Sequence, residues 1–496
     1  MLASIPGEDN PRMCQLSRWP TEQAGWGDEM LPGNRVICGM IRSVTDFKKP
    51  FFIGIAGTGM SAIAQYLQGT GKQVAGSDRF FLPGEENETR TRLEAEGILC
   101  FEQNGEGITA ETDLVVVSAA IEDTVGEVQK AKALNIPILT RAALLAIIAS
   151  SKKTIAVGGT SGKSTTTAML FDILQYAGMK PSIISGAGLV SIIREGKIGN
   201  AKVGEGDWLV IEADESDGSI VQYKPAIGLL LNVDKDHKEL DVLMDVFKTF
   251  AGNSEKFVVN RSHYLAKTLS KNSDWDFSIT DAPAGFRATG FQQEGMTIRF
   301  FVNQVPFSMN VIGRHNMENA VAAVTVAAMT GVDLNTSSAA IRNYEGIYRR
   351  NQVIGTKNGV LLIDDYAHNP VKCAAAISSC QPLAEKVVAW FQPHGYGPTR
   401  FLRNDFVEEI SRVLRPQDEI WMSEIFYAGG TATKDISAAD LINDIKAKGR
   451  NAYFCEDRNE FVRSVRTHLG ENTVLLLMGA RDPSLEKFAK QVWEEL

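Results

Sequence analysis

Cysteine pairs, long apolar runs and basic clusters are all missing from this sequence, and each absence excludes a class of protein. The six cysteines include no Cys-x-x-Cys pair, which argues against a disulfide-built secreted scaffold and favours reduced thiols in a cytoplasm. No segment approaches the roughly 20 consecutive apolar residues that cross a bilayer, so no membrane partner is expected. The net charge is −9 without any basic run, so no nucleic acid is expected as a partner.

The composition that remains is that of an ordinary globular protein, 44% hydrophobic and 22% charged. A length of 496 residues predicts about three domains. We expect a poorly ordered extension over residues 1–48, because this segment shows neither hydrophobic periodicity nor the apolar core of a signal peptide. The three domains are then expected at residues 49–148, 149–345 and 346–496.

The segment 154–167 is the strongest local signal, an apolar run that breaks into glycines and continues as an amphipathic segment. This order is typical of a strand, a phosphate-binding loop and a helix. Lys163 can reach the terminal phosphates of a nucleoside triphosphate, and the Ser164 hydroxyl can bind Mg²⁺. The strict motif has glycine where this chain has Val157, so the match is to a shortened form over 159–164. The alternative is a glycine-rich turn with a surface lysine.

The first expected domain opens with a second glycine loop. A strand over 51–56 runs into this loop, and a further strand over 74–78 ends in Asp78, 24 residues after Gly54. This is the start of a Rossmann-like unit, in which Asp78 meets a ribose hydroxyl or caps a loop. The glycines fall as G-x-x-G-x-G, which weakens an NAD assignment and leaves other nucleotide diphosphates open. Ser118 follows a third strand, at the edge where such sheets bind ligands.

Acidic residues end two predicted strands of the central domain. The strand over 208–212 runs into four carboxylates within 212–217, and the strand over 226–233 precedes His237. Carboxylates at a buried strand end need a positive partner, which a metal supplies. Ser164, Glu212 and His237 are therefore predicted as a Mg²⁺ site, although a structural role for His237 remains open. Asn-Lys-x-Asp, the guanine-reading signature of GTPases, is absent, so adenine is the expected base.

Two later features fit the same nucleotide. Asn316 and Asn319 lie one helical turn apart and can donate to and accept from an adenine edge, although N-capping is an open alternative for Asn316. Arg349 and Arg350 lie at an expected hinge, where they clamp phosphates or form a solvated basic pair. Beyond them, strands alternate with helical segments, which predicts a second doubly wound sheet. The fold class is thus α/β, with a Rossmann-like N-terminal domain, a central parallel sheet of the P-loop ATPase type and a Rossmann-like C-terminal domain.

Taken together, these motifs resemble the Mur ligases in order and spacing, from about residue 50 to the end. Within that family they are most similar to the branch that joins L-alanine to UDP-N-acetylmuramate (the MurC type). The matching segments are 54–61, 76–78, 118–121, 159–167, 212–217, 313–320, 349–350, 364–370 and 391–394.

The resemblance implies an ATP-dependent, ADP-forming amide ligase of peptidoglycan precursor synthesis that works through an acyl phosphate, with Mg²⁺ as cofactor. It implies catalytic roles for Lys163, Glu212, His237 and Arg350, and metal binding by Ser164, Glu212 and His237. The implied ATP-binding residues are Gly159, Thr160, Ser161, Gly162, Lys163, Ser164, Thr165, Asn316, Asn319, Arg350 and Asp365. The implied UDP-sugar-binding residues are Gly57, Thr58, Gly59, Met60, Asp78 and Ser118. His394 and Arg400 are the implied amino-acid-binding residues.

The chain departs from the family pattern in the amino-acid-binding loop. Gly395 and Pro398 occupy the places of two arginines that grip the carboxylate of the amino acid, and Arg400 is the remaining candidate. Ser161 and Asn369 replace histidines. The alternative within the family is therefore a ligase that attaches another amino acid, or a recycled murein peptide, to UDP-N-acetylmuramate. A monomer or a homodimer in the cytoplasm is expected.

Two hypotheses from other classes stay open at this stage. An oxidoreductase would use the first glycine loop for NAD, but it leaves the phosphate loop and the acidic strand end without a role. A catalytically silent regulator would keep the fold and bind nucleotide. Only the ligase uses every motif.

Overall fold

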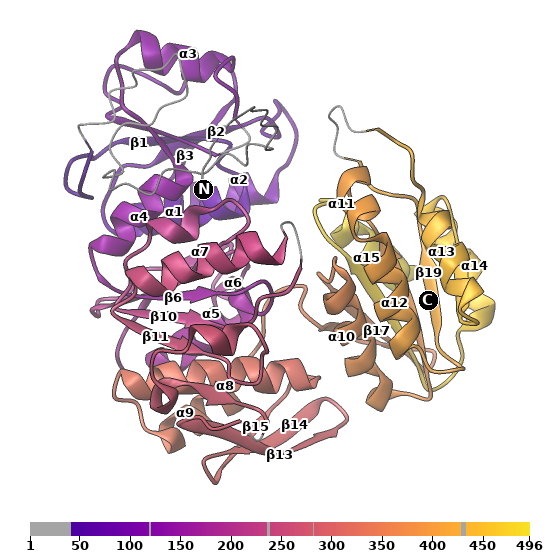
Figure 1. The fold of residues 1–496 in the computed structure, drawn as a ribbon. Helices are drawn as coiled ribbons and strands as arrows, with labels where there is room; N and C mark the ends of the chain where they lie inside the picture. Colours follow the sequence, from indigo (N-terminus) through magenta and orange to yellow (C-terminus); the bar gives the residue numbers. More distant parts are fainter. Residues whose placement is uncertain (1–40, 119–120, 236–238, 281, 428–432) are drawn as a thin grey trace, which may run out of the picture.

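The computed structural model describes residues 41–118, 121–235, 239–280, 282–427 and 433–496. Its parts form a column of three sheets with a fourth sheet beside it (Figure 1). Most of the predicted extension, residues 1–40, and the predicted metal ligand His237 lie outside the described residues. Residues 41–48 lie against the first sheet, where Phe47 is buried and Lys72 Nζ donates to its carbonyl oxygen at 2.6 Å.

The N-terminal sheet is five-stranded and parallel, in the order β3-β2-β1-β4-β5. All four residues of β1 are buried, as expected for an inner parallel strand covered by helices on both faces. The strands are β1 (Pro50–Ile53), β2 (Ala75–Asp78), β3 (Leu99–Glu102), β4 (Leu114–Val117) and β5 (Ile138–Thr140). The helices are α1 (Thr58–Gly69), α2 (Glu88–Ala95), α3 (Gly126–Ala133) and α4 (Arg141–Ser150).

The central sheet has six strands in the order β11-β10-β6-β9-β7-β8, and only β8 is antiparallel to its neighbour. This order sets the carboxyl ends of β6, β9 and β10 side by side. The strands are β6 (Lys153–Gly158), β7 (Ser182–Ile184), β8 (Ala201–Lys202), β9 (Trp208–Glu212), β10 (Ile227–Leu230) and β11 (Lys256–Val259). The helices are α5 (Lys163–Tyr176), α6 (Val190–Ile193), α7 (Leu240–Asn253), α8 (Arg314–Met329) and α9 (Leu334–Arg342), with the 3₁₀ turns η1 (Ser219–Gln222), η2 (Ala266–Leu269) and η3 (Ser273–Trp275).

A small sheet extends the column below α8 (Figure 1). Apolar and polar residues alternate between 286 and 309 and form its antiparallel strands, whose inward residues pack on α8 in the core of the central domain. Its strands are β12 (Phe277–Ser278), β13 (Phe286–Glu294), β14 (Thr297–Val302) and β15 (Val305–Met309).

The C-terminal sheet has the order β16-β17-β21-β18-β19-β20 and is parallel except for β16. The chain's last strand, β21, is therefore one of its inner strands. The strands are β16 (Gln352–Lys357), β17 (Val360–Asp365), β18 (Lys386–Gln392), β19 (Glu419–Met422), β20 (Asn451–Phe454) and β21 (Thr473–Gly479). The helices are α10 (Pro370–Cys380), α11 (Tyr396–Phe401), α12 (Arg403–Val413), α13 (Ala438–Ala447), α14 (Phe461–Val465) and α15 (Leu485–Glu495), with η4 (Gln381–Leu383), η5 (Arg458–Glu460) and η6 (Arg466–His468).

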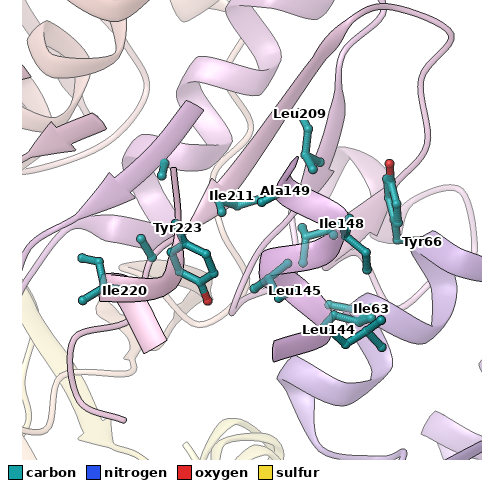
Figure 2. Packing of buried hydrophobic residues seen from close by; sticks show 14 of the residues in the cluster. Ile63, Tyr66, Leu144, Leu145, Ile148, Ala149, Leu209, Ile211, Ile220 and Tyr223 are labelled. Atoms are coloured by element: carbon teal, nitrogen blue, oxygen red, sulfur yellow. The ribbon is translucent and has the colours of Figure 1, made fainter. Parts of the chain in front are cut away.

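The hydrophobic core is continuous between the first two sheets. Figure 2 shows side chains of α1 and α4 gathered with those of β9 and η1, among them Ile63, Leu145, Ile211 and Ile220. The C-terminal sheet instead buries its own two clusters, to which Ile312 and the partly buried Met296 contribute from outside. The first two sheets thus form one packed body. The C-terminal sheet forms a second body, joined to the first by the chain at 349–352 and by contacts such as Gln293 Nε2 to the Ser379 carbonyl oxygen at 3.1 Å.

The three doubly wound layers confirm the predicted α/β architecture. In the part of the chain that the structure describes, no helix combines the length and the apolar character that crossing a membrane requires.

Candidate active site

The phosphate loop lies between β6 and α5, as the segment 154–167 predicts. Gly159 and Gly162 have φ values of +134° and +83°, which L side chains rarely adopt. A Cβ on Gly162 would lie 2.3 Å from Asn319 Oδ1. The glycines therefore let the loop turn tightly beneath α8, and its amides open toward the start of α5.

Lys163 begins α5 and is almost enclosed, with 13% of its side chain exposed. Its Nζ donates to Gly159 O and to Glu215 Oε2, each at 2.8 Å. Burial acts to lower the pKa of Lys163, but Glu215 and its acidic neighbours outweigh burial and raise the pKa. Lys163 is therefore positively charged and held in place by the Glu215 carboxylate. A phosphate group of a ligand can replace that carboxylate as the partner of the ammonium.

Ser164 and Glu212 meet as the sequence predicts. Ser164 Oγ donates to Glu212 Oε2 at 2.9 Å, and the backbone N–H of Gly186 donates to the same oxygen at 2.8 Å. A hydroxyl next to a carboxylate is an oxygen ligand set that suits Mg²⁺, which binds proteins through one or two carboxylates and completes its shell with water and phosphate. Across the described ranges there is no group of three acidic, histidine or cysteine side chains able to hold a metal, so this pair would share the ion with the nucleotide.

Asn232, just after β10, is a site residue that the sequence reasoning did not single out. Its Oδ1 accepts from Thr160 Oγ1 at 2.9 Å and from the Ser161 N–H at 2.8 Å, and its Nδ2 donates to Ser161 O at 3.1 Å. These bonds hold the phosphate loop to the neighbouring strand. A polar residue at the carboxyl end of a strand beside the loop is the signal that could have identified it.

Asn316 and Asn319 lie on one face of α8, each with 7% exposure. Asn319 Oδ1 accepts from Thr166 Oγ1 at 3.3 Å, while Asn316 Nδ2 donates to Ile312 O at 2.8 Å. The N-cap of α8 is Gly313, so the alternative that Asn316 caps the helix is wrong. α8 begins earlier because Gly313 takes a positive φ of +92° that suits the turn into the helix.

The two adjacent arginines have different environments. Arg349 forms an ion pair with Asp364, with Nε to Oδ2 at 2.7 Å, and both side chains are nearly buried. Arg350 instead lies beside the ring of Tyr366, 5.0 Å from its centroid, and faces the cavities described below. Asp365 accepts the Asn351 N–H at 2.6 Å. Arg349 therefore fixes the connection between the bodies, and Arg350 is the one available to a ligand.

Two cavities meet at the phosphate loop. The first, which we call the α8 cavity, measures about 390 Å³ and lies between the loop, α8 and α10. The second, the α1 cavity, measures about 460 Å³ and lies between the loop, the glycines before α1 and the C-terminal body. The residues common to both walls are Thr160, Lys163, Ser164, Glu212, Arg350 and Lys372.

The α8 cavity collects nearly all of the residues predicted for ATP. Of that set only Gly159 is missing from its wall, and Gly159 packs against the end of β10 instead. The wall also holds residues that sequence reasoning missed, including His263, His315, Glu318 and Tyr344.

The α1 cavity collects all but one of the residues predicted for the nucleotide sugar, namely Gly57, Thr58, Gly59, Met60 and Ser118. The exception is Asp78, which lies beneath the loop. Its carboxylate accepts the N–H groups of Ala56 at 2.9 Å and Phe80 at 3.0 Å. Both oxygens thus bind backbone, as the loop-capping alternative predicts.

The predicted amino-acid-binding residues line neither cavity. His394 borders a small space of about 10 Å³ with Pro398 and with His368, which also lines the α1 cavity, and the two histidine rings lie 5.6 Å apart. Arg400 forms an ion pair with Asp435, and about half of its side chain is exposed. Gly395 has a φ of +73°, where any side chain is strained.

The C-terminal body instead presents other side chains to the α1 cavity, among them His368, Lys372 and Arg481. Burial lowers the pKa of His368 well below its usual range, so the ring is neutral. Its Nδ1 lies 3.0 Å from the Tyr366 carbonyl oxygen. Because a carbonyl oxygen only accepts, Nδ1 carries the proton and Nε2 remains an acceptor.

Comparison with known proteins gives matches over most of the chain. Three family models match in sequence order: Mur ligase family, catalytic domain, at residues 51–153; Mur ligase middle domain, at 157–327; and Mur ligase, glutamate ligase domain, at 349–481. The UDP-N-acetylmuramate–L-alanine ligase of Carboxydothermus hydrogenoformans is 32% identical over 455 residues, covering 88% of this chain and 95% of its own length. That of Caldanaerobacter subterraneus is 34% identical over 459 residues, covering 88% and 95%.

Solved structures agree with this assignment. The UDP-N-acetylmuramate–alanine ligase of Thermotoga maritima has a TM-score of 0.74 at 26% identity, covering 90% of this chain and 98% of its own. A murein peptide ligase of Psychrobacter arcticus has a TM-score of 0.64 at 21% identity over 90% and 98%, a likeness of fold. The chain therefore belongs to the Mur ligase family and is an ATP-dependent ligase.

Proposed function

We propose that this chain joins an amino acid, with L-alanine the first candidate, to the carboxylate of UDP-N-acetylmuramate during peptidoglycan precursor synthesis. One observation carries the proposal: the α8 and α1 cavities share a wall that contains Lys163, Ser164, Glu212 and Arg350. A nucleoside triphosphate in one cavity and a carboxylate substrate in the other would meet at that wall. The reaction is assigned to the cytoplasm, with a monomer or homodimer as the working form.

In the first step, the substrate carboxylate attacks the γ-phosphorus of ATP, giving an acyl phosphate and ADP. Lys163 and the loop amides stabilise the charge on the transferring phosphoryl group, and Arg350 adds a second cation from the hinge. Ser164 and Glu212 would hold Mg²⁺, with His237 as the predicted third ligand; when bound, the ion neutralises phosphate charge. Asn316 and Asn319 are proposed to recognise adenine in the α8 cavity.

In the second step, the amine attacks the acyl carbon, and the tetrahedral intermediate collapses to an amide and phosphate. The amine nitrogen loses one proton as the new bond forms, and that proton leaves with the departing phosphate. His368 is proposed to orient the amine, because its neutral ring presents an unprotonated Nε2 that accepts a hydrogen bond at the α1 cavity. Enclosure between the two bodies keeps water from the acyl phosphate.

The amine could also be another amino acid or a murein peptide. The observation that favours this second candidate is the pair Gly395 and Pro398 in place of the usual arginines. The oxidoreductase and the silent regulator are not retained, since the chain is an ATP-dependent ligase by family.

The direct test is phosphate release by the purified chain with ATP, Mg²⁺ and UDP-N-acetylmuramate, against a panel of amino acids and short peptides. We expect turnover only when all components are present, and the mass of the product identifies the amine. If no amine in the panel releases phosphate above the ATP-only rate, the proposed function is wrong.

The backbone cap formed by Asp78 provides a test of the UDP-sugar site. Asp78→Asn removes one acceptor from the glycine loop, and a hydrogen bond to a charged group contributes about 1.5–3 kcal/mol. We expect the KM for UDP-N-acetylmuramate to rise about 10-fold, with the KM for ATP unchanged, in steady-state assays.

Asp113 supplies a matched control, because it caps the N–H groups of Lys48 and Lys49 at 2.6 and 2.8 Å in the same domain but lies outside the α1 cavity wall. Asp113→Asn should lower the thermal midpoint and leave both KM values unchanged. Equal KM changes in the two variants would point to a general loss of structure and contradict a local role for Asp78.

A further inference from the structure

This inference rests on the proposed function, in which the carboxylate of the amine substrate needs a cation at the α1 cavity. The loop after β18 does not supply one. Pro398 faces the small space beside His394, and Gly395 donates its N–H to the Phe426 carbonyl at 2.9 Å. Arg400 is engaged with Asp435 and with the Thr433 carbonyl at 3.1 Å.

Five cationic side chains line the α1 cavity, and they are not equally available: Arg141, Lys163, Arg350, Lys372 and Arg481. Arg141 forms an ion pair with Asp217, and Lys163 forms one with Glu215. Lys163, Arg350 and Lys372 also lie on the wall shared with the α8 cavity, where phosphoryl transfer is proposed. Arg141 and Arg481 line the α1 cavity only, and of these two it is Arg481 that, among the described residues, has no hydrogen bond or ion pair from its side chain.

Arg481 follows the carboxyl end of β21, an inner strand that pairs with both β17 and β18. Ligands bind in parallel sheets at this edge, where loops from neighbouring strands converge. Here the sheet order brings Arg481 to the same cavity as His368, which follows β17. The guanidinium and the imidazole therefore line one cavity from adjacent strands.

The backbone at Arg481 is held in an unusual conformation. Its φ is +63°, in the left-handed region that non-glycine residues seldom occupy. The next residue, Asp482, forms a buried ion pair with Arg458 and accepts the Ser484 N–H at 2.9 Å. These bonds hold the turn, so the backbone defines where the exposed side chain of Arg481 leaves the sheet. Such strain is commonly kept where it positions a functional group.

We propose that Arg481 binds the carboxylate of the amine substrate in the α1 cavity, and that it takes the place of the arginines absent at positions 395 and 398. The planar guanidinium can donate two parallel hydrogen bonds to a carboxylate. With the carboxylate held there, the α-amino group lies on the side of His368 and the shared wall. Arg481 is thus a determinant of amine specificity.

The test compares a free amino acid with its carboxamide, which keeps the amine and loses the charge. The probes are L-alanine and L-alaninamide, or the same pair for whichever amino acid gives the highest turnover. We expect the unaltered chain to prefer the free acid in kcat/KM by a large factor. In Arg481→Gln this preference should fall about 10- to 100-fold, as expected for a lost charged hydrogen bond, with the KM for ATP unchanged.

Arg400→Gln tests the competing site, because it removes an arginine from the loop in which the family resemblance places the amino acid. The matched control is Arg463→Gln, which removes an exposed arginine of the same domain that lies outside the α1 cavity wall. Both variants should leave the preference for the free acid unchanged. The preference of Arg481→Lys for the free acid should lie between those of the unaltered chain and Arg481→Gln, since lysine keeps the charge and loses the paired donors.

Three outcomes would overturn the inference. The first is that Arg481→Gln keeps the full preference, and the second is that Arg400→Gln loses it instead. A third is a rise in the KM for UDP-N-acetylmuramate alone in Arg481→Gln, which would assign the guanidinium to the nucleotide sugar. An unaltered chain that releases no phosphate with any amine is a distinct result, which removes the proposed function and this inference with it.

Discussion

Replacing Lys163 with methionine is expected to lower kcat/KM for ATP by at least about 10²- to 10³-fold, the loss typical of a group that stabilises developing transition-state charge. The lysine lies on the wall common to both cavities, and its ammonium is already held within the phosphate loop by Gly159 O. Methionine keeps most of the side-chain volume and removes only the charge. The measurement is phosphate release at varied ATP and saturating UDP-N-acetylmuramate.

The same change also affects stability, and the two effects can be separated. Glu215 has only 4% of its side chain exposed, and breaking a buried ion pair costs about 3–5 kcal/mol. The double variant Lys163→Met/Glu215→Gln also removes the carboxylate charge. It should regain most of the lost free energy of unfolding, measured by denaturant titration, without regaining activity.

Lys153 provides the control for charge removal in general. It lies at the opposite end of β6, exposed to solvent, and Lys153→Met should leave kcat/KM unchanged. Activity in the double variant within about 10-fold of the unaltered chain would show that Lys163 has a structural role only, and the mechanism proposed here would have to be abandoned.

Gly162→Ala should produce the second largest effect, about a 10²-fold loss of kcat/KM for ATP. The added Cβ would lie 2.3 Å from Asn319 Oδ1 and 3.3 Å from Leu231 Cδ1, so the loop or α8 must shift. A displacement of about 1 Å at a reacting group is enough to cost 10²-fold in rate. Because the clash involves a residue proposed to contact adenine, the KM for ATP should rise as well.

Gly178→Ala is the matched control for backbone strain. Gly178 has a φ of +75°, close to the +83° of Gly162, but no atom lies within 4 Å of its Cβ position. Both variants should lose about 1–2 kcal/mol of stability from the left-handed backbone, whereas only Gly162→Ala should lose activity. Similar activities in the two variants would mean that the loop tolerates the side chain and that the contact with Asn319 is unimportant.

Much of the fold could be predicted because each element depends on residues that are close together in the chain. The run before the phosphate loop is a buried strand, and Lys163 begins the helix that follows. Val157, which departs from the strict motif, lies inside β6, so the tight turn needs only Gly159 and Gly162. The alternation over 286–309 likewise formed antiparallel strands.

The site was harder to predict where a residue's role depends on a distant partner. Asp78 has the position of a ribose ligand in sequence, yet its carboxylate accepts two backbone N–H groups. Arg349 and Arg350 are neighbours with the same chemistry, but only Arg349 meets Asp364. The sequence around Arg481 indicates no functional role, except that the residue follows a strand. Its proposed role in binding a carboxylate depends on the cavity that it lines.

The amino-acid sequence by itself determined the secondary structure, the phosphate loop and the class of nucleotide, because these depend on periodicity and on short contiguous motifs. Only the tertiary structure decided which side chains line the shared wall of the two cavities and which cation remains available to the amine. The physical reason is that strand order in a parallel sheet sets the neighbours at its carboxyl edge. β21 inserts between β17 and β18, and no spacing along the chain reveals that Arg481 and His368 line the same cavity.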